Sequence, residues 1–223
     1  MKEIYKQIDY MKNDLIDLSL QIHSNPEIKW EEFEAIKNIE TLLNKYDIKI
    51  NKIKDLPTAF TASIKGNSKG PVIALLAEYD ALPGIGHACG HNLIAMTNIG
   101  AFLGFLALKG NFPGEIKLIG TPAEEGGGGK ISLLDKNIFD DIDISLSSHG
   151  SSNTTILWED VPMGTGMSLA TSKAIYEFYG KASHAAINPD QGINALNAVI
   201  MLFNGIDSLR QHVKDDTLSL IHI

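Results

Sequence analysis

The residues best suited to chemistry lie in one short segment, His87-Ala88-Cys89-Gly90-His91-Asn92. It contains the only cysteine of the chain and two of its seven histidines, and Gly90 permits a tight turn between Cys89 and His91. Thiolate and imidazole groups are ligands for divalent transition metals. Taken alone, the segment fits a buried structural cysteine beside a core histidine just as well.

Three further groups of candidate ligands each follow an apolar run that predicts a buried strand. Glu78 and Asp80 follow residues 71–77, Glu124 and Glu125 follow residues 115–120, and His149 follows residues 143–147. Ligands of open α/β sheets bind outside the carboxyl ends of the strands. We therefore expect these side chains to converge with Cys89 and His91, which favours a metal site over a structural cysteine.

The adjacent Glu124 and Glu125 suit metal-assisted hydrolysis. A pair of glutamates on a loop is often only a solvated acidic patch, but here Pro122 and Gly126 restrict the backbone on either side. Because adjacent carboxylates point in different directions, one can bind a metal while the other acts as a general base.

The remaining histidines are weaker candidates. His87 is interpreted as a turn residue or a support for the ligands, and His184 lies beyond the predicted sheet, where its small neighbours allow close approach of a partner or substrate. The others are interpreted as structural: His23, His212 and His222.

The elements that must position these residues alternate between helix and strand. Apolar periodicity predicts helices over residues 4–22, 30–46 (with Phe33 facing inward), 92–108 and a short stretch to Leu134, and strands over residues 59–64, 71–77, 115–120 and 143–147. Asn25-Pro26 should end the first helix. This alternation predicts an α/β fold with a doubly wound, mostly parallel sheet.

The pattern changes after Asn153. Residues 155–161 and 168–179 have the alternation of strands, and residues 192–212 have the periodicity of a long amphipathic helix. We place a domain boundary near Gly166, which gives a first domain over 1–165 and a second, α+β domain over 166–223.

Composition excludes several classes of function. The chain has 223 residues, 44% of them hydrophobic, and a formal net charge of −8 without a basic block, which argues against nucleic acid or an anionic membrane as partner. A single cysteine cannot form an internal disulfide. The N-terminus lacks an apolar signal core, and the apolar run 93–108 is short for a membrane span, so we expect a cytoplasmic protein.

Five segments, in this order, resemble peptidase family M20, the aminoacylase/carboxypeptidase-like metallohydrolases: 77–83 (AEYDALP), 86–92 (GHACGHN), 120–126 (GTPAEEG), 148–150 (SHG) and 180–185 (GKASHA). They are most similar to the Cys-Gly-His amidohydrolase branch. The Cys-Gly-His-Asn form, with four glycines after the glutamate pair, is closest to the dipeptidase and aminobenzoyl-glutamate-hydrolase-like subgroup.

The resemblance implies a metal-dependent hydrolase that cleaves the amide bond of a small dipeptide or N-acyl amino acid. Two divalent metal ions are implied, Zn²⁺ favoured and Mn²⁺ or Co²⁺ possible, with these ligands: Cys89 as a bridge, His91, Glu125 and His149. Glu124 would be the general base for the bridging water, and Asp80 would orient a ligand. His184, on an inserted lid domain that also forms a homodimer, would act in the neighbouring subunit's site.

Two departures from the family pattern leave alternatives open. Many relatives have a histidine ligand where this chain has Glu78. Relatives also continue past the end of this chain, which lies inside the lid; they return from the lid to complete the catalytic domain and supply a last histidine ligand there. We therefore expect that the chain is C-terminally truncated. The alternatives are an inactive fragment that serves only as a metal-binding or dimerisation module, and a hydrolase that uses Cys89 as its nucleophile.

Overall fold

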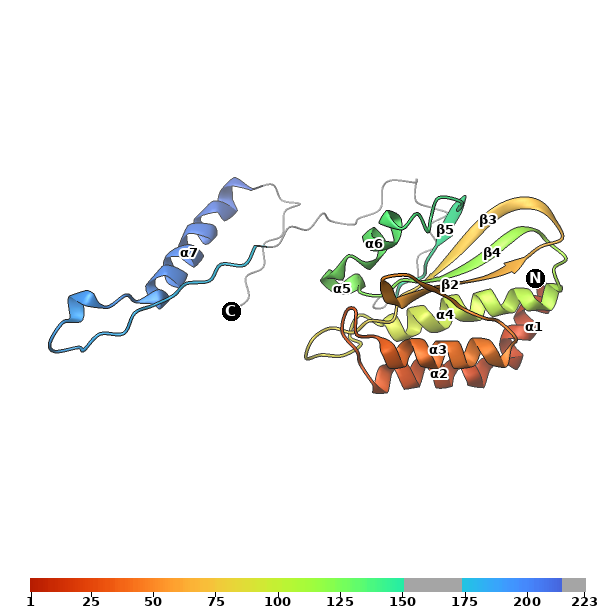
Figure 1. Ribbon diagram of the computed structural model, residues 1–223, viewed down its shortest axis with the longest axis horizontal. Helices are drawn as coiled ribbons and strands as arrows, with labels where there is room; N and C mark the ends of the chain where they lie inside the picture. Colours follow the sequence, from red (N-terminus) through yellow and green to blue (C-terminus); the bar gives the residue numbers. More distant parts are fainter. Residues whose placement is uncertain (151–173, 214–223) are drawn as a thin grey trace. The chain divides into compact units, whose positions relative to one another are not determined.

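The computed structural model describes residues 1–150 and 174–213 of the chain (Figure 1). The chain forms two compact units, Met1–Ile156 and Leu157–Ile223. Each unit is described by itself below. The predicted domain boundary near Gly166 falls among residues 151–173, outside the described part, and stays a prediction.

The first unit is built on a five-stranded sheet with the order β1-β2-β4-β3-β5. Its strands are β1 (Asn51–Ile53), β2 (Leu56–Lys65), β3 (Ser68–Ala77), β4 (Pro113–Gly120) and β5 (Ile144–Leu146). The four predicted strands of this unit are all present. β3 runs parallel to β4 and β5, whereas β2 runs antiparallel to both β1 and β4.

The sheet is therefore mixed: β2 runs against the other four strands, so the expectation of a mostly parallel sheet holds for all strands but β2. Only Gly66 and Asn67 separate β2 from β3, so the chain reverses direction there instead of crossing over through a helix. β4 then pairs with both strands and lies between them. A Cβ atom on Gly66 would overlap the carbonyl oxygen of Phe112, so this close approach requires glycine.

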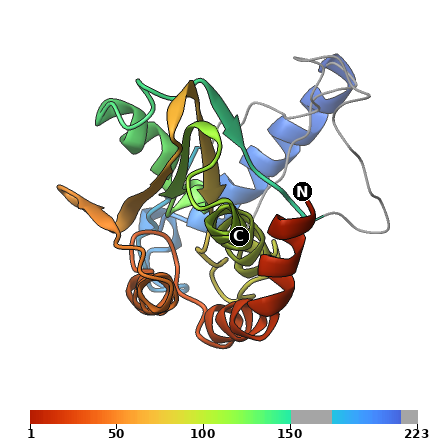
Figure 2. The ribbon, with the colours of Figure 1, turned by 90° about the vertical axis from the view of Figure 1, so that its right-hand side faces the viewer.

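Both faces of the sheet are covered (Figures 1 and 2). One face packs on the helices α1 (Lys2–Tyr10), α2 (Lys12–Ser24), α3 (Phe33–Lys45) and α4 (His91–Gly104), and the other on α6 (Gly129–Asp135). Side chains alternate between the two cores along a strand: Leu75 belongs to the first, and Ala74 and Leu76 to the second. The doubly wound arrangement was thus predicted correctly, although the antiparallel direction of β2 was not.

Several helix boundaries differ from the prediction. The single helix expected over residues 4–22 is broken at the fully buried Met11, where the backbone leaves helical geometry (φ −89°, ψ 0°). The next helix begins at Phe33, because Trp30 takes a left-handed conformation (φ +67°). Phe33 was expected to face inward, but it lies at the first turn and is 55% exposed.

The apolar helix α4 continues into a 3₁₀ turn, η1 (Phe105–Leu108). Among the described residues, His91–Leu108 is the one helix long and apolar enough to cross a membrane, with 18 residues and a mean hydropathy of 1.4. It is 56% buried and packs against α2 and β3. These contacts identify it as the core helix of the first unit.

The described part of the second unit, residues 174–213, contains η3 (Pro189–Gln191), α7 (Ala195–Leu209) and η4 (Arg210–His212). α7 starts at Ala195 because the Asn194 side chain caps it, accepting a hydrogen bond from the Leu196 amide (3.0 Å). The strand predicted over 168–179 is not formed by residues 174–179, which pair with no described strand. Residues 168–173 and the strand predicted over 155–161 lie outside the described residues.

Candidate metal centre

The candidate residues of the first unit meet at the carboxyl ends of three neighbouring parallel strands. Ala77 at the end of β3 is in register with Gly120 at the end of β4, so the two following loops leave the sheet side by side. One carries Glu78 and Asp80, and the other leads to Glu124 and Glu125, which begin the single irregular turn α5 (Glu124–Gly127). The convergence expected from strand order is therefore present.

His91 is at the centre of this group. It is 1% exposed, and its Nδ1 lies 3.0 Å from both the carboxylate Oδ1 and the backbone oxygen of Asp80. Both partners are acceptors, so Nδ1 carries a proton and donates it, and the lone pair of the neutral ring lies on Nε2. Asp80 thereby presents Nε2 as a potential ligand atom, the arrangement typical of histidines that bind metals.

The Nε2 atom of His91 is buried and has no hydrogen-bond partner among the described residues. Three carboxylates face it instead, with oxygens at 3.4 Å (Glu78), 3.7 Å (Glu124) and 3.9 Å (Glu125). In the neutral ring, this buried nitrogen is a lone pair among carboxylate oxygens and lacks the donor that would satisfy it. A divalent cation would satisfy all of these groups at once.

The pKa values of His91 and Asp80 depend on their burial and on the charges and hydrogen bonds around them. Burial by itself would lower the pKa of His91, but the hydrogen bond to Asp80 and the charges of Asp80 and Glu78 outweigh it and raise the pKa. For Asp80 burial raises the pKa, but hydrogen bonds from His91 and from the backbone amide of Glu125 (2.8 Å to Oδ2) bring it below its usual value.

Cys89 lies beside His149. The Sγ atom is 3.6 Å from Nε2 of His149, whose Nδ1 is 2.7 Å from the carbonyl oxygen of Gly150. Burial, a hydrogen bond to the Glu125 carboxylate and the surrounding negative charges raise the pKa of Cys89 to about 11. Without a bound cation the thiol is therefore protonated at neutral pH.

Among the described residues there are two sets of three candidate ligand atoms, and within each set the atoms lie within 4.8 Å of one another. Cys89, His91 and His149 form one set, and His91, Glu124 and Glu125 form the other. Both share His91. Sulfur, imidazole nitrogen and carboxylate oxygen together suit a borderline-soft divalent metal such as zinc. The residues present therefore fit a metal centre.

Glu124 differs from Glu125 in its surroundings. Its side chain is 43% exposed, and burial, followed by the charge of Glu78, raises its pKa, whereas Lys130 opposes the rise. A carboxylate with a raised pKa and access to solvent is suited to accept a proton near neutral pH.

The backbone before Glu124 is held in place by a buried glutamate that the sequence did not point to. Glu32 is fully buried, and its Oε1 accepts hydrogen bonds from the amides of Trp30 (3.0 Å) and Ala123 (2.8 Å). Ala123 has a left-handed backbone (φ +56°), unusual for a residue with a Cβ, and its carbonyl accepts from the Gly129 amide (3.2 Å). Glu32 and Ala123 are separated by 91 residues, so no local pattern reveals the contact.

Two other charged residues complete the surroundings. Lys130, the second residue of α6, forms an ion pair with Glu78, whose side chain is 9% exposed. The four glycines before it were the sequence signal for this loop: Gly126 and Gly128 have positive φ angles (+75° and +66°), and a Cβ on Gly129 would overlap the carbonyl oxygen of Pro122.

The remaining histidines are not part of these sets. His87 is buried, and both its ring nitrogens lack a hydrogen-bond partner among the described residues; its ring lies 6.3 Å from that of His23. His184 and His212 belong to the second unit, and His222 lies outside the described residues. The role predicted for His184 stays a prediction.

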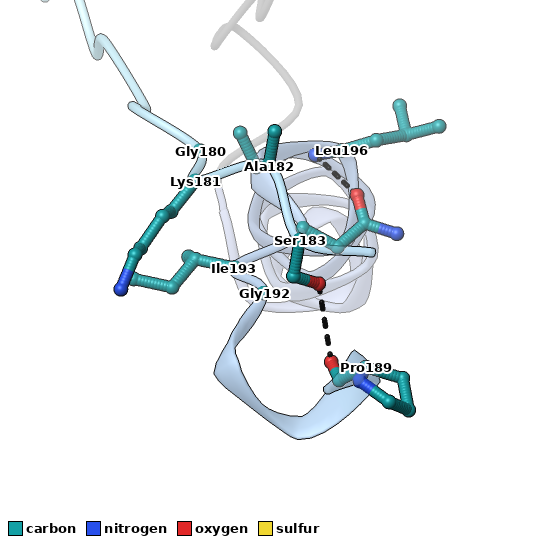
Figure 3. A pocket seen from close by; sticks show the side chains of 10 residues that line it. Gly180, Lys181, Ala182, Ser183, Pro189, Gly192, Ile193 and Leu196 are labelled. Atoms are coloured by element: carbon teal, nitrogen blue, oxygen red, sulfur yellow. Dashed lines mark hydrogen bonds between the residues drawn. The ribbon is translucent and has the colours of Figure 1, made fainter. Parts of the chain in front are cut away.

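His184 is held within its own loop, where its Nδ1 accepts hydrogen bonds from the amides of Ala186 and Ile187 (both 3.2 Å). The neighbouring residues line an open hollow of about 620 Å³. Figure 3 shows its lining side chains, among them Lys181 and Ser183, near the N-terminus of α7. None of the candidate metal ligands lines it.

Comparison with known proteins identifies the family. The sequence profile described as peptidase family M20/M25/M40 matches residues 74–215, which include all the candidate ligands. The chain belongs to peptidase family M20. The resemblance noted from its motifs is thereby confirmed.

Relatives of the chain include the Xaa-Arg dipeptidase of Mus musculus, 36% identical over 94% of this chain and 50% of the relative. A p-aminobenzoyl-glutamate hydrolase subunit of Escherichia coli is 33% identical over 96% of this chain and 47% of its own length. A solved structure from Bacillus subtilis, described as a dinuclear metal-binding peptidase of the M20 family, is 29% identical with a TM-score of 0.61, covering 65% of this chain and 44% of that one. The chain spans about half the length of these curated relatives.

Proposed function

We propose that the protein is a metal-dependent hydrolase of the amide bond in a small dipeptide or N-acyl amino acid. The observation that carries the proposal is the buried Nε2 of His91, which has no hydrogen-bond partner among the described residues and faces oxygens of three carboxylates at 3.4–3.9 Å. Membership of the M20 family and the names of the relatives, a dipeptidase and an aminobenzoyl-glutamate hydrolase, support the same reaction class.

In this proposal two divalent ions would be held by these residues of this chain: Cys89, His91, Glu125 and His149. Bound divalent ions supply Lewis-acid activation of the attacked carbonyl and of water. The solved relative described as dinuclear supports the number of ions. The thiolate and imidazole ligands favour Zn²⁺ over Mn²⁺ or Co²⁺.

The residues around the ions have separate tasks. Asp80 keeps the proton of His91 on Nδ1, so that Nε2 stays a ligand atom. Glu124 accepts a proton from the attacking water and transfers it to the leaving nitrogen, which departs as an amine while the acyl carbon becomes a carboxylate. His184, on a lid domain that also forms a homodimer, donates a hydrogen bond to the developing oxyanion in the neighbouring subunit's site. We propose a cytoplasmic location, consistent with the absence of a disulfide partner for Cys89.

The surroundings of Cys89 argue against the alternative of a cysteine nucleophile. Such enzymes lower the pKa of the thiol with a neighbouring cation, whereas here burial and carboxylates raise the pKa of Cys89 to about 11. Chelation therefore separates the two mechanisms. It should abolish metal-dependent hydrolysis and leave a cysteine hydrolase active.

The test is a metal analysis of the purified protein together with hydrolysis of a panel of dipeptides and N-acyl amino acids. We expect stoichiometric divalent metal, activity that a chelator removes and activity that added Zn²⁺ or Mn²⁺ restores. Protein that binds no divalent metal would rule the proposal out. Metal binding without hydrolysis by the 223-residue chain, beside an active longer form, would support the alternative of a metal-binding or dimerisation module.

A further inference from the structure

Lys130 occupies a position that its own helix disfavours. It is the second residue of α6, and a positive charge in the first turn opposes the helix dipole. Its ammonium group nevertheless points to the metal centre, where it pairs with Glu78. The glycine loop makes this possible, because Gly129 packs directly against the carbonyl of Pro122, just after the end of β4.

Glu78 lies close enough to His91 to share a metal ion with it, but its carboxylate is bound by Lys130. One carboxylate oxygen, Oε2, lies 3.4 Å from the open Nε2 of His91, and the other, Oε1, is bound by Lys130. The side chain is 9% exposed, so solvent does not compete for it. Glu78 is nevertheless absent from both sets of ligand atoms, and the carboxylates of the second set are those of Glu124 and Glu125.

We propose that Lys130 is a positioning residue that holds the Glu78 carboxylate out of the ligand set around His91. The ion pair leaves the ligands proposed above, which are one thiolate, two imidazoles and the Glu125 carboxylate, a combination suited to zinc. If Glu78 were released, it would add an oxygen ligand and a full negative charge, and such oxygen-rich sites favour harder cations such as Mn²⁺. Lys130 thereby sets the metal preference of the centre. This inference rests on the proposed metal site.

The test is calorimetric titration of the 223-residue chain with Mn²⁺ and, separately, with Zn²⁺. Lys130→Met should tighten Mn²⁺ binding by about tenfold or more, with a smaller gain for Zn²⁺, because a carboxylate close to the ion is released. Lys130→Arg should stay near the unmodified protein, since it keeps the charge. Lys136→Met is a matched control, because Lys136 pairs with Asp55 (2.9 Å), which is not among the candidate ligands.

The double variant Glu78→Gln/Lys130→Met separates the carboxylate from the mere loss of positive charge, and it should return Mn²⁺ affinity to near the original value. If Lys130→Met does not fold, Lys130→Gln replaces it with a polar side chain and carries the same expectation. A Mn²⁺ affinity within about twofold of Lys136→Met, or a gain that persists in the double variant, overturns the role of Lys130 while leaving the metal site intact. Absence of metal binding in the unmodified chain overturns the proposed function itself.

Discussion

At the scale of single residues, Glu124 and Glu125 differ in their surroundings, and these differences bear on their proposed roles as base and ligand. Glu125 donates its backbone amide to Asp80, and its carboxylate lies near Cys89. Glu124 is more exposed, at 43% against 23% for Glu125 in side-chain terms, and has a raised pKa. These differences favour Glu124 as the proton acceptor and Glu125 as the ligand.

Glu124→Gln should therefore lower kcat by about 10²–10⁴-fold, because the amide is isosteric but cannot accept the proton. Metal content should be unchanged, since Glu124 is not a proposed ligand. Metal analysis and steady-state kinetics on the same preparation check both points. Full activity in this variant would remove Glu124 as the base.

Metal affinity should depend on pH through Cys89. Its pKa of about 11 means that the thiol is protonated over the range pH 6–8, so a metal that binds the thiolate must release that proton. The raised pKa of His91 adds to the competition at the acidic end of the range. Affinity should accordingly rise with pH, by about one power of ten per pH unit for each proton released. Titrations in buffers of different ionisation enthalpy measure that proton release, and affinity that does not change with pH would exclude Cys89 as a ligand.

At the scale of elements, the site depends on the loop between β4 and α6 and on its tether to the start of α3. Glu32 joins the two through its hydrogen bond to the Ala123 amide. Burial raises the pKa of Glu32, and its hydrogen bonds offset only part of this rise. An ionised carboxylate at this position therefore costs free energy of folding. Its contribution is to hold the strained Ala123, and with it Glu124.

Glu32→Leu should lower the free energy of unfolding by about 1–3 kcal/mol, because the buried amide of Ala123 and the part-buried amide of Trp30 lose their acceptor. It should also lower kcat more than it raises KM, since the displaced group, Glu124, is the proposed base. Glu32→Gln is the matched control, because its amide oxygen can still accept both hydrogen bonds. Chemical denaturation and kinetics give the two measurements, and equal loss in both variants would contradict the proposed tether.

At the scale of the whole molecule, the candidate metal centre of the first unit combines side chains from distant parts of the chain. The candidate ligands follow β3, begin α4, follow β4 and follow β5. Because Cys89 and His91 lie in one segment and Glu125 and His149 in two others, a cation that binds all of them would tie three separate segments together, in the folded state only. Under the proposed metal site, metal binding and folding of this unit would therefore be coupled.

Removal of metal should lower the midpoint of thermal unfolding of the first unit. A metal present at about 1,000 times its Kd adds about 4 kcal/mol of stability, which is lost with the metal. Calorimetry of metal-loaded and chelated protein measures the shift, and Cys89→Ser should reduce it. An unchanged midpoint would show that the ligands do not bind a cation in the folded protein.

The sequence by itself determined the residue types of the centre and the strand ends on which they lie. Both follow from local patterns: apolar runs that form strands, and ligand-type residues directly after them. Only the tertiary structure decided that β2 runs antiparallel to β4, that Asp80 fixes the proton of His91, and that Lys130 and Glu32 hold Glu78 and Ala123. The last two contacts join residues 52 and 91 positions apart, and pairings over such separations depend on how elements pack rather than on any local pattern.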